Sequence, residues 1–327
     1  MGKVCKGNVE SIQKGIRMSK NLLFVQLRNL LKRMKYVNNW YSFYFVYFKI
    51  IKKTLIKFKN GINCEISVDN TAPFYFIEQF ITDKESKAIF LKNKKAIELL
   101  GKSDFIFEYG NHKYYIKKDY EIDSLHEIFQ NLAEPQTYKI FSKLHGELFI
   151  NVGSNAGGYA IPASKNFKRV ICLEPNPKIF YELNKNMELN KIKNTKSLNV
   201  AAWSRKTKLK LFEPKDQNGY GGGISTLLPK YMEKEGINYN TYFYVNTITL
   251  NELLKNQKVI DLLLIDAENA EVEILRGSDK ILDRTKAIII EVRNNTEKQT
   301  KEILKKYKFK ITDLDKSTNS KNIFGFK

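Results

Sequence analysis

Cysteine and histidine are scarce in this 327-residue sequence, with three copies of each. Cys5, Cys64 and Cys172 are widely spaced and form no CxxC pair, which argues against a disulfide framework or a zinc site and favours a reducing compartment. No apolar run reaches the roughly 20 residues that a membrane-spanning helix needs. The longest, from Trp40 to Ile51, is interrupted by a serine and a lysine. We therefore expect a cytoplasmic protein without a transmembrane helix.

Acidic residues are almost missing from the first 60 positions, where 14 lysines and arginines face the single acid Glu10. The whole chain has a formal net charge of +21, which favours anionic partners such as nucleic acid, phosphorylated lipid or an acidic glycan. Basic residues flank the aromatic run from Trp40 to Ile51, as in helices that lie on an anionic membrane surface. Peripheral attachment to the inner membrane surface is one interpretation. Packing of these aromatics on the rest of the protein is the other.

The pattern of elements divides the chain into three parts. Residues 1–35 form a basic N-terminal arm, residues 36–145 an α+β region, and residues 146–327 a larger α/β domain. In the second part the aromatic helix precedes a hairpin over Thr54–Val68, with Asn60-Gly61 at its turn. A helix over Lys84–Leu100 and a second hairpin over Phe105–Ile116 follow.

From Glu147 onward, short apolar runs alternate with amphipathic segments, which is typical of a parallel sheet built from βαβ units. Strands are expected at Leu148–Val152, Arg169–Leu173, Ser197–Ala201, Leu262–Asp266 and Ala287–Val292. Helices are expected at Gly157–Lys165, Pro177–Asn190, Thr249–Lys255, Ala270–Leu282 and Glu297–Tyr307. The tail from Phe309 forms two antiparallel strands at the sheet edge. The fold class is a doubly wound, Rossmann-like, mainly parallel sheet with C-terminal antiparallel strands and an N-terminal α+β extension.

The first strand runs directly into a glycine-containing turn, Gly153-Ser154-Asn155-Ala156-Gly157. Such a turn presents backbone N–H groups to a ligand at the carboxyl edge of the sheet. Dinucleotide-binding loops have glycine at the middle position because the backbone touches the pyrophosphate. Asn155 fills that space with a side chain, so a cofactor without pyrophosphate, S-adenosylmethionine (AdoMet), fits better.

A carboxylate follows the second strand at Glu174, twenty-one residues after Gly153. An acid at this place in a doubly wound sheet accepts hydrogen bonds from the ribose hydroxyls of a nucleotide. We therefore expect Glu174 to bind the ribose of AdoMet.

Four sequence blocks together resemble the FkbM family of AdoMet-dependent methyltransferases. They are NVGSNAG from Asn151, EPNP from Glu174, NVAAWS from Asn199, and LLIDAENAE from Leu263 followed by LRGSDKIL. The resemblance covers roughly Glu147 to Glu291. It implies an O-methyltransferase acting on a hydroxyl of a glycan, glycolipid or related metabolite, with a cofactor site at Asn151, Gly153, Asn155, Gly157, Glu174, Ala201 and Asp266.

The chain departs from the family pattern at three positions. Asn151 stands where aspartate is common, which weakens a carboxylate role toward the methionine amino group. In the fourth block the family commonly has Lys-Ile-Asp-x-Glu-Gly, whereas this chain has Leu264 in place of the lysine and Asn269 in place of the glycine.

Asp266 and Glu268 are the expected acid/base residues, because the carboxyl ends of central strands meet at one crevice. Asp266 can alternatively cap a helix and hold the methionine end of AdoMet, leaving the proton to solvent. The same two acids with Glu291 and Asn294 offer oxygen ligands to Mg²⁺, the second cofactor considered. A glycine-rich insertion over Glu213–Asn246 is expected to form a lid on the acceptor side, with Tyr220, Ser225 and Thr226 as contacts.

Two other functions stay open. The basic, aromatic N-terminus also suits a nucleic-acid methyltransferase. Base methylation is disfavoured, because Ile265-Asp266-Ala267-Glu268 lacks a Pro-Pro-aromatic element and Cys172 lies inside a strand. Methylation of the RNA ribose 2′-hydroxyl and a non-catalytic AdoMet-binding protein are the remaining alternatives.

Overall fold

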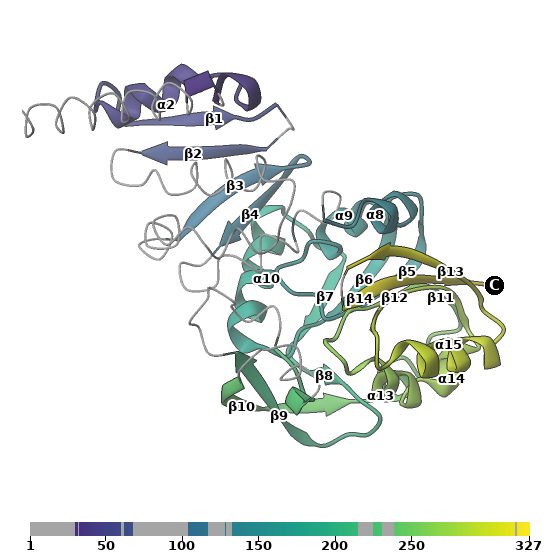
Figure 1. Ribbon diagram of the computed structural model, residues 1–327. Coiled ribbons are helices and arrows are strands. Elements are labelled where there is room, and N and C mark those ends of the chain that lie inside the picture. The colour runs from purple at the N-terminus through teal and green to yellow at the C-terminus, as the bar shows by residue number, and fades with distance from the viewer. Residues whose placement is uncertain are drawn as a thin grey trace, which may run out of the picture. The chain divides into compact units, whose positions relative to one another are not determined.

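The structure is a computed structural model that describes residues 30–31, 33–59, 62–67, 104–116, 128, 133–214, 225–230, 239–317 and 319–327 (Figure 1). The chain divides into two compact units. The N-terminal unit contains Met1–Leu99 and Phe107–Gly110, and the C-terminal unit contains Leu100–Ile106 and Asn111–Lys327. The candidate site lies entirely in the C-terminal unit.

The described part of the N-terminal unit begins with the aromatic helix and the first hairpin. Helix α2 spans Trp40–Tyr47 and is followed by the antiparallel strands β1, Lys53–Lys57, and β2, Asn63–Ser67. Phe43 and Val46 of the helix are buried, and the Arg33 guanidinium lies 4.3 Å from the centre of the Phe43 ring. The hairpin strands are confirmed, whereas the turn at Asn60-Gly61 and the expected helix over 84–100 lie outside the described residues.

The second predicted hairpin is confirmed as β3, Phe105–Tyr109, and β4, His112–Ile116. Its turn has positive φ at both Gly110 (57°) and Asn111 (64°), the conformation that a two-residue hairpin turn requires. Strand β4 is bound to the C-terminal unit's own helix α10, Pro177–Leu189. The backbone N–H groups of Lys113 and Tyr115 donate to the side-chain oxygens of Asn190 and Asn186.

The described residues of the C-terminal unit contain the expected doubly wound sheet, in the order β13-β14-β12-β11-β5-β6-β7. Strands β12, β11, β5, β6 and β7 are parallel, while β14 pairs antiparallel with both β12 and β13. Their bounds are β5 Gly146–Val152, β6 Phe167–Leu173, β7 Thr195–Leu198, β11 Ile260–Ile265, β12 Thr285–Arg293, β13 Lys310–Lys316 and β14 Ser320–Phe326. The predicted fold class, including the antiparallel edge formed by the tail, is confirmed.

The helices expected between the strands are present with one correction, and a further helix, α8 over Pro135–Phe141, is not among those expected. The predicted helix 270–282 is two helices, which meet at Gly277 and Ser278. Gly277 packs so closely on Trp203 that a Cβ there would lie 2.3 Å from the Trp203 carbonyl oxygen. The bounds are α8 Pro135–Phe141, α9 Ala160–Asn166, α12 Leu250–Leu253, α13 Glu271–Arg276, α14 Asp279–Leu282 and α15 Glu297–Lys306.

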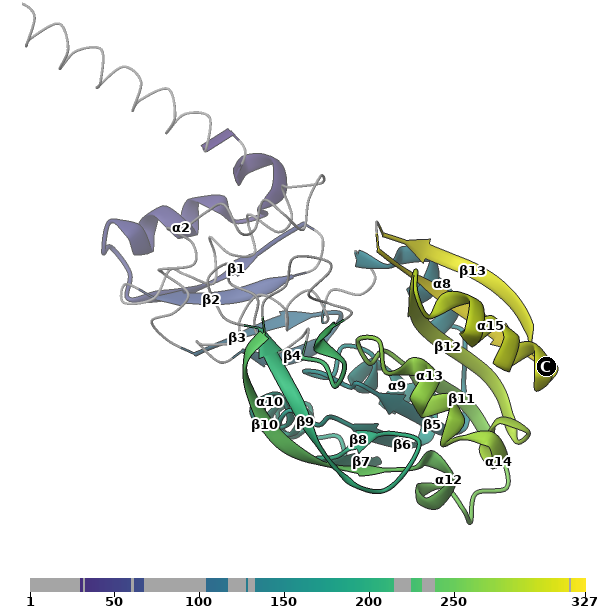
Figure 2. The same cartoon turned by 60° about the horizontal axis from the view of Figure 1, so that its bottom comes forward.

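A second, three-stranded sheet borders the insertion that the sequence predicts between the third and fourth strands. Its order is β8-β10-β9, with β8 at Ala201–Ala202, β9 at Lys208–Pro214 and β10 at Tyr239–Ile248. It lies at the β7 side of the unit, away from β13 and β14 (Figures 1 and 2). The predicted strand 197–201 is therefore split. The Asn199 amide donates to the carbonyls of Glu174 and Pro175 and directs the chain from one sheet into the other.

Candidate active site

The turn after β5 is held against the ends of two neighbouring strands. The N–H groups of Gly153 and Ser154 both donate to the Leu173 carbonyl at the end of β6, and the Asp266 N–H donates to the Val152 carbonyl. Gly153 has φ +75°, and a Cβ there would lie 1.7 Å from the Asp266 carbonyl oxygen. Only glycine fits this position, because both the left-handed backbone and the close approach exclude a side chain.

Glu174 closes the same turn from the β6 side. The Asn155 N–H donates to one carboxylate oxygen of Glu174 at 2.9 Å, and the Asn176 N–H donates to the other, also at 2.9 Å. Asn155 itself adopts φ 43° and accepts a hydrogen bond from the Ala156 N–H. The carboxylate is thus fixed in orientation at the carboxyl edge of the sheet.

A cavity begins at this turn. One wall is apolar, which suits an aromatic base. The cavity is lined by Val152, Gly153, Asn155, Leu173, Glu174, Pro175, Ile179, Val200, Ala201, Ala202, Leu211, Ser225, Leu227, Asp266, Ala267, Glu268, Ala270 and Ile274.

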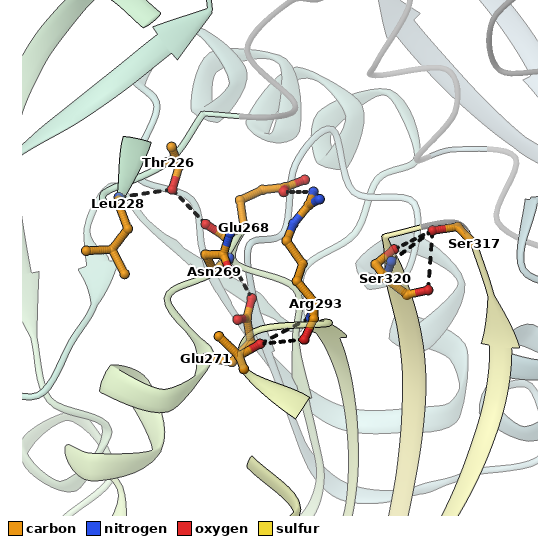
Figure 3. A network of polar contacts seen from close by, with 9 residues as sticks. Thr226, Leu228, Glu268, Asn269, Glu271, Arg293, Ser317 and Ser320 are labelled. Atoms are coloured by element: carbon orange, nitrogen blue, oxygen red, sulfur yellow. Dashed lines mark hydrogen bonds and ion pairs between the residues drawn. The ribbon is translucent and has the colours of Figure 1, made fainter. Parts of the chain in front are cut away.

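The three-stranded sheet forms part of the cavity wall and is attached at two points. Glu213 at the end of β9 accepts from the Asn176 amide at 2.8 Å and pairs with Lys178 at 3.2 Å. At the second point, the Thr226 hydroxyl donates to the Glu268 carbonyl at 2.6 Å (Figure 3). Thr226 also pairs through its backbone with Phe212. Both attachments involve residues adjacent to the predicted site.

Three carboxylates that the sequence offers as oxygen ligands lie close together, and two of them, Asp266 and Glu268, line the cavity. Oxygen atoms of Asp266, Glu268 and Glu291 all lie within 4.8 Å of one another, and each side chain is half-buried. Glu268 forms an ion pair with Arg293 at the end of β12 (Figure 3). The arginine supplies a positive charge inside the cluster.

A fourth acid, Glu271, lies fully buried at the start of α13. One of its oxygens accepts from the Asn269 N–H at 3.0 Å, whereas Oε2 has no hydrogen-bond partner within the described residues. Burial, reinforced by the negative charges of Glu291 and Glu268, raises its pKa to about 8. Glu271 is therefore mainly protonated at neutral pH.

The loop between β11 and α13 explains one departure from the family pattern. Glu268 and Asn269 both have positive φ, 49° and 78°. Glycine adopts this conformation without strain, and asparagine tolerates it better than most residues. Asn269 thus replaces the family's glycine while keeping the left-handed turn. Leu264, which replaces the family's lysine, is buried within β11.

Six of the eight predicted site residues line the cavity: Gly153, Asn155, Glu174, Ala201, Asp266 and Glu268. Gly157 does not line the cavity. It has φ +99°, and its lack of a side chain allows Ile161 and Leu183 to pack closely against it. Asn151 also lies outside the lining. It is buried, and neither atom of its amide has a hydrogen-bond partner in the described structure. Ser225 of the predicted lid lines the cavity, whereas Tyr220 lies outside the described residues.

Sequence reasoning missed Arg293 and the apolar wall. Arg293 ends a buried strand two residues after Glu291, and a charged residue there is a usable signal. Ile179 and Leu211 look like ordinary core residues in the sequence, because nothing in their local pattern separates a cavity wall from a core.

A glycine turn, an acid after the second strand and a cavity at the carboxyl edge of a doubly wound sheet define the class of Rossmann-like nucleotide-cofactor enzymes. Residues 151–312 match the family model described as "Methyltransferase FkbM domain". The chain thus contains a domain of this family and is an AdoMet-dependent methyltransferase. A search of the curated proteins finds no match.

Two of the solved structures similar to the chain are the following. TYW2 of M. jannaschii in complex with AdoMet is 12% identical, with 68% of this chain and 85% of that chain covered and a TM-score of 0.39. Precorrin-6y C5,15-methyltransferase from Geobacter metallireducens GS-15 is 13% identical, with 57% and 84% covered and a TM-score of 0.36.

Proposed function

We propose that the protein transfers a methyl group from AdoMet to a hydroxyl of a glycan, glycolipid or related metabolite. The observation that carries the proposal is the cavity itself, which is lined both by Glu174, the acid expected at the ribose, and by the acids Asp266 and Glu268. With the cofactor ribose at Glu174, the carboxylates of Asp266 and Glu268 would be left for the acceptor hydroxyl.

The lining residues fit AdoMet by chemistry. Glu174 would accept hydrogen bonds from the ribose hydroxyls, and the apolar side chains of Ile179, Val200 and Leu211 would contact the adenine. The backbone around Gly153 and Asn155 would face the methionine part. When bound, AdoMet supplies an electrophilic methyl group, and the remaining tasks of alignment and proton removal belong to the chain's own residues.

We propose that the Asp266 carboxylate removes the proton from the acceptor hydroxyl. A hydroxyl oxygen that gains a methyl group must lose its proton, and a carboxylate at hydrogen-bond distance can take it directly or through a water molecule. Glu268 is held by Arg293, so its role is to position the acceptor and the Asp266 carboxylate. Glu291 completes the negative cluster.

Arg293 also affects whether the three carboxylates need Mg²⁺ to balance their charge. The carboxylate oxygens of Asp266, Glu268 and Glu291 are suitable ligands for a hard cation, but the guanidinium already neutralises Glu268. We therefore propose that Arg293 performs the charge balance and that turnover needs no divalent cation. Turnover in EDTA should equal turnover with added Mg²⁺, and a loss in EDTA that Mg²⁺ restores would contradict this.

We further propose that the N-terminal unit brings the enzyme to an anionic membrane surface. In support, Tyr41, Phe45, Tyr47 and Phe48 are exposed on and beside α2, within a strongly basic segment. None of the helices that the structure describes is long and apolar enough to span a bilayer. Replacing Phe45 and Phe48 by serine should weaken sedimentation with phosphatidylserine vesicles and leave AdoMet affinity unchanged. Equal sedimentation of the variant would contradict the proposal.

The function is tested by supplying radiolabelled AdoMet with separated lipid, glycan and RNA fractions. The proposal expects label in the glycan or lipid fraction. Asp266→Asn should abolish most of it while retaining AdoMet binding, and Asp283→Asn, an exposed acid outside the cavity, should behave as wild type. Label in RNA alone would favour the ribose 2′-hydroxyl, and AdoMet binding without any transfer would favour a non-catalytic protein.

A further inference from the structure

The outer face of strands β9 and β10 carries side chains that the cofactor site does not use. Side chains alternate between two faces over Lys208–Phe212 of β9 and Tyr242–Thr247 of β10. Leu211 and Val245 point inward, where Leu211 lines the cavity and both belong to one buried cluster. The residues next to Leu211 on β9 and next to Val245 on β10 point to the opposite, outward face. The ribbon therefore closes the cofactor cavity with one face and presents the other to solvent.

Aromatic and basic side chains alternate on that outward face. The register pairs Tyr242 with Phe212, Tyr244 with Lys210, and Asn246 with Lys208. Tyr242 and Tyr244 are 48% and 57% exposed, far more than aromatic side chains in a core. Their ring centres lie 5.9 Å apart, and that of Phe212 lies 5.6 Å from Tyr242. These three rings form one continuous aromatic strip.

The lysines lie directly against this strip. The Lys210 Nζ is 3.9 Å from the centre of the Tyr242 ring, and the Lys208 Nζ is 5.7 Å from that of Tyr244. No acidic residue occurs in the sequence between Ser204 and Phe212 or between Tyr239 and Asn251. Glu213 at the end of β9 is the one acid on these two strands, and it pairs with Lys178. The positive charge of Lys208 and Lys210 favours an anion on this face.

We propose that this face, defined by Lys208, Lys210, Phe212, Tyr242 and Tyr244, binds an acidic polysaccharide, the part of the acceptor remote from the methylated hydroxyl. The proposal rests on the proposed glycan methylation. The positively polarised C–H groups of a sugar ring pack on the negative face of a tyrosine ring. The lysines meet the carboxylates of the sugar acids through charge-assisted hydrogen bonds.

The ring geometry favours sugars over stacked bases. The planes of Tyr242 and Tyr244 are at 85° to each other, so two successive bases cannot stack in parallel on both rings. Sugar units need no common plane, because each one packs on a ring by itself. A polymer on this face lies on the other side of the ribbon from the cavity. Only a long acceptor can contact both places, whereas a monosaccharide reaches the cavity alone.

The test measures retention of the full-length protein on immobilised polygalacturonate, with neutral dextran and poly(U) as competing matrices. Wild type should bind polygalacturonate and not dextran. Tyr242→Ala/Tyr244→Ala and Lys208→Gln/Lys210→Gln should each weaken binding at least tenfold, whereas Lys305→Gln/Lys306→Gln, which removes two exposed charges elsewhere, should change it less than twofold. Thermal melting of each variant shows that it is folded.

Unchanged binding by both double variants, or a preference of wild type for poly(U), would overturn the proposal. AdoMet affinity should be the same in every variant, since none of these residues lines the cavity. If the variants lose polygalacturonate binding but wild type transfers no methyl group to any glycan, the surface stands and the proposed function fails. If wild type transfers a methyl group to a glycan but the variants bind polygalacturonate normally, the proposed function stands and the surface proposal fails.

Discussion

At the residue scale, the loop between β11 and α13 depends on backbone conformations that few side chains tolerate. Asn269 has φ 78° and is 2% exposed, and its N–H binds Glu271. An alanine at such a φ costs roughly 1–2 kcal/mol, while glycine costs nearly nothing. The family's glycine and this chain's asparagine therefore serve the same turn.

Asn269→Ala should lower the free energy of unfolding by about 1–2 kcal/mol, and Asn269→Gly should change it by less than about half of that. Urea unfolding of both variants beside wild type measures the difference. Equal stability of the alanine variant would mean that this loop relaxes and that the left-handed turn is not required.

Glu271 gives a pH-dependent prediction. Folding raises its pKa from the ordinary 4.5 to about 8, so between these values the folded protein holds a proton that the unfolded chain has lost. This residue's contribution to stability therefore falls as pH rises from 4.5 through 8. Glu271→Gln mimics the protonated side chain and removes the dependence.

The melting temperature of Glu271→Gln should be close to that of wild type at pH 5 and above it at pH 9. Glu188→Gln on the exposed side of α10 serves as the control, because its side chain is solvated. A constant difference at both pH values would show that Glu271 is ionised in the folded protein.

Which site residues the sequence reveals depends on local pattern. Glu174 and Gly153 could be predicted because a strand, a glycine turn and an acid at this spacing are typical of nucleotide-binding sites in doubly wound sheets. Arg293 and Ile179 were missed because their roles arise only when distant segments meet. Asn151 and Gly157 belong to the same motif but lie outside the cavity lining, so their place in cofactor binding stays a prediction.

At the element scale, Asp261 joins the starts of three neighbouring strands. Its carboxylate accepts from the N–H groups of Glu147 and Leu148 at 2.8 and 3.0 Å, and it pairs with Lys286 at 2.7 Å. Burial alone would raise its pKa, but the bonds from Lys286 and the two N–H groups outweigh burial and hold the pKa below its usual range. Gly146 packs directly on this carboxylate.

Asp261→Asn should destabilise the protein by about 1–3 kcal/mol near pH 7, mainly through the weakened bonds to the two N–H groups. Lys286 is largely exposed, so its ion pair contributes little. Because the pKa of Asp261 is lowered by folding, its contribution is lost as pH falls through the folded value. Denaturant titrations from pH 7 down to pH 3 should show the two proteins converging, and a gap that persists would refute this account.

The parallel strands and the antiparallel tail could be predicted because each is a short apolar run between turn residues. Strands β9 and β10 were missed, although Lys208–Phe212 alternates between lysine and apolar residues, and Tyr242–Asn246 alternates between residues with a polar group and apolar ones. The glycine-rich segment between them indicates a loop, and the whole insertion was therefore interpreted as a lid. Pairing of strands so far apart in sequence is a tertiary property that local pattern does not specify.

At the scale of the whole molecule, one sheet supplies both the rigid frame and the site. Strands β5, β6 and β11 bring Gly153, Glu174 and Asp266 to one edge, and the β8-β10-β9 sheet closes the cavity there. The N-terminal unit contributes none of the lining residues. Cofactor binding is therefore expected to be a property of the C-terminal unit.

The central claim is that AdoMet lies in this cavity with its ribose at Glu174. Calorimetric titration of wild type, Glu174→Ala and the exposed control Glu188→Ala with AdoMet tests it most directly. We expect the control to match wild type and Glu174→Ala to lose about 1–3 kcal/mol of binding free energy, the scale of hydrogen bonds to a charged group. Equal AdoMet affinity in all three proteins would contradict the claim.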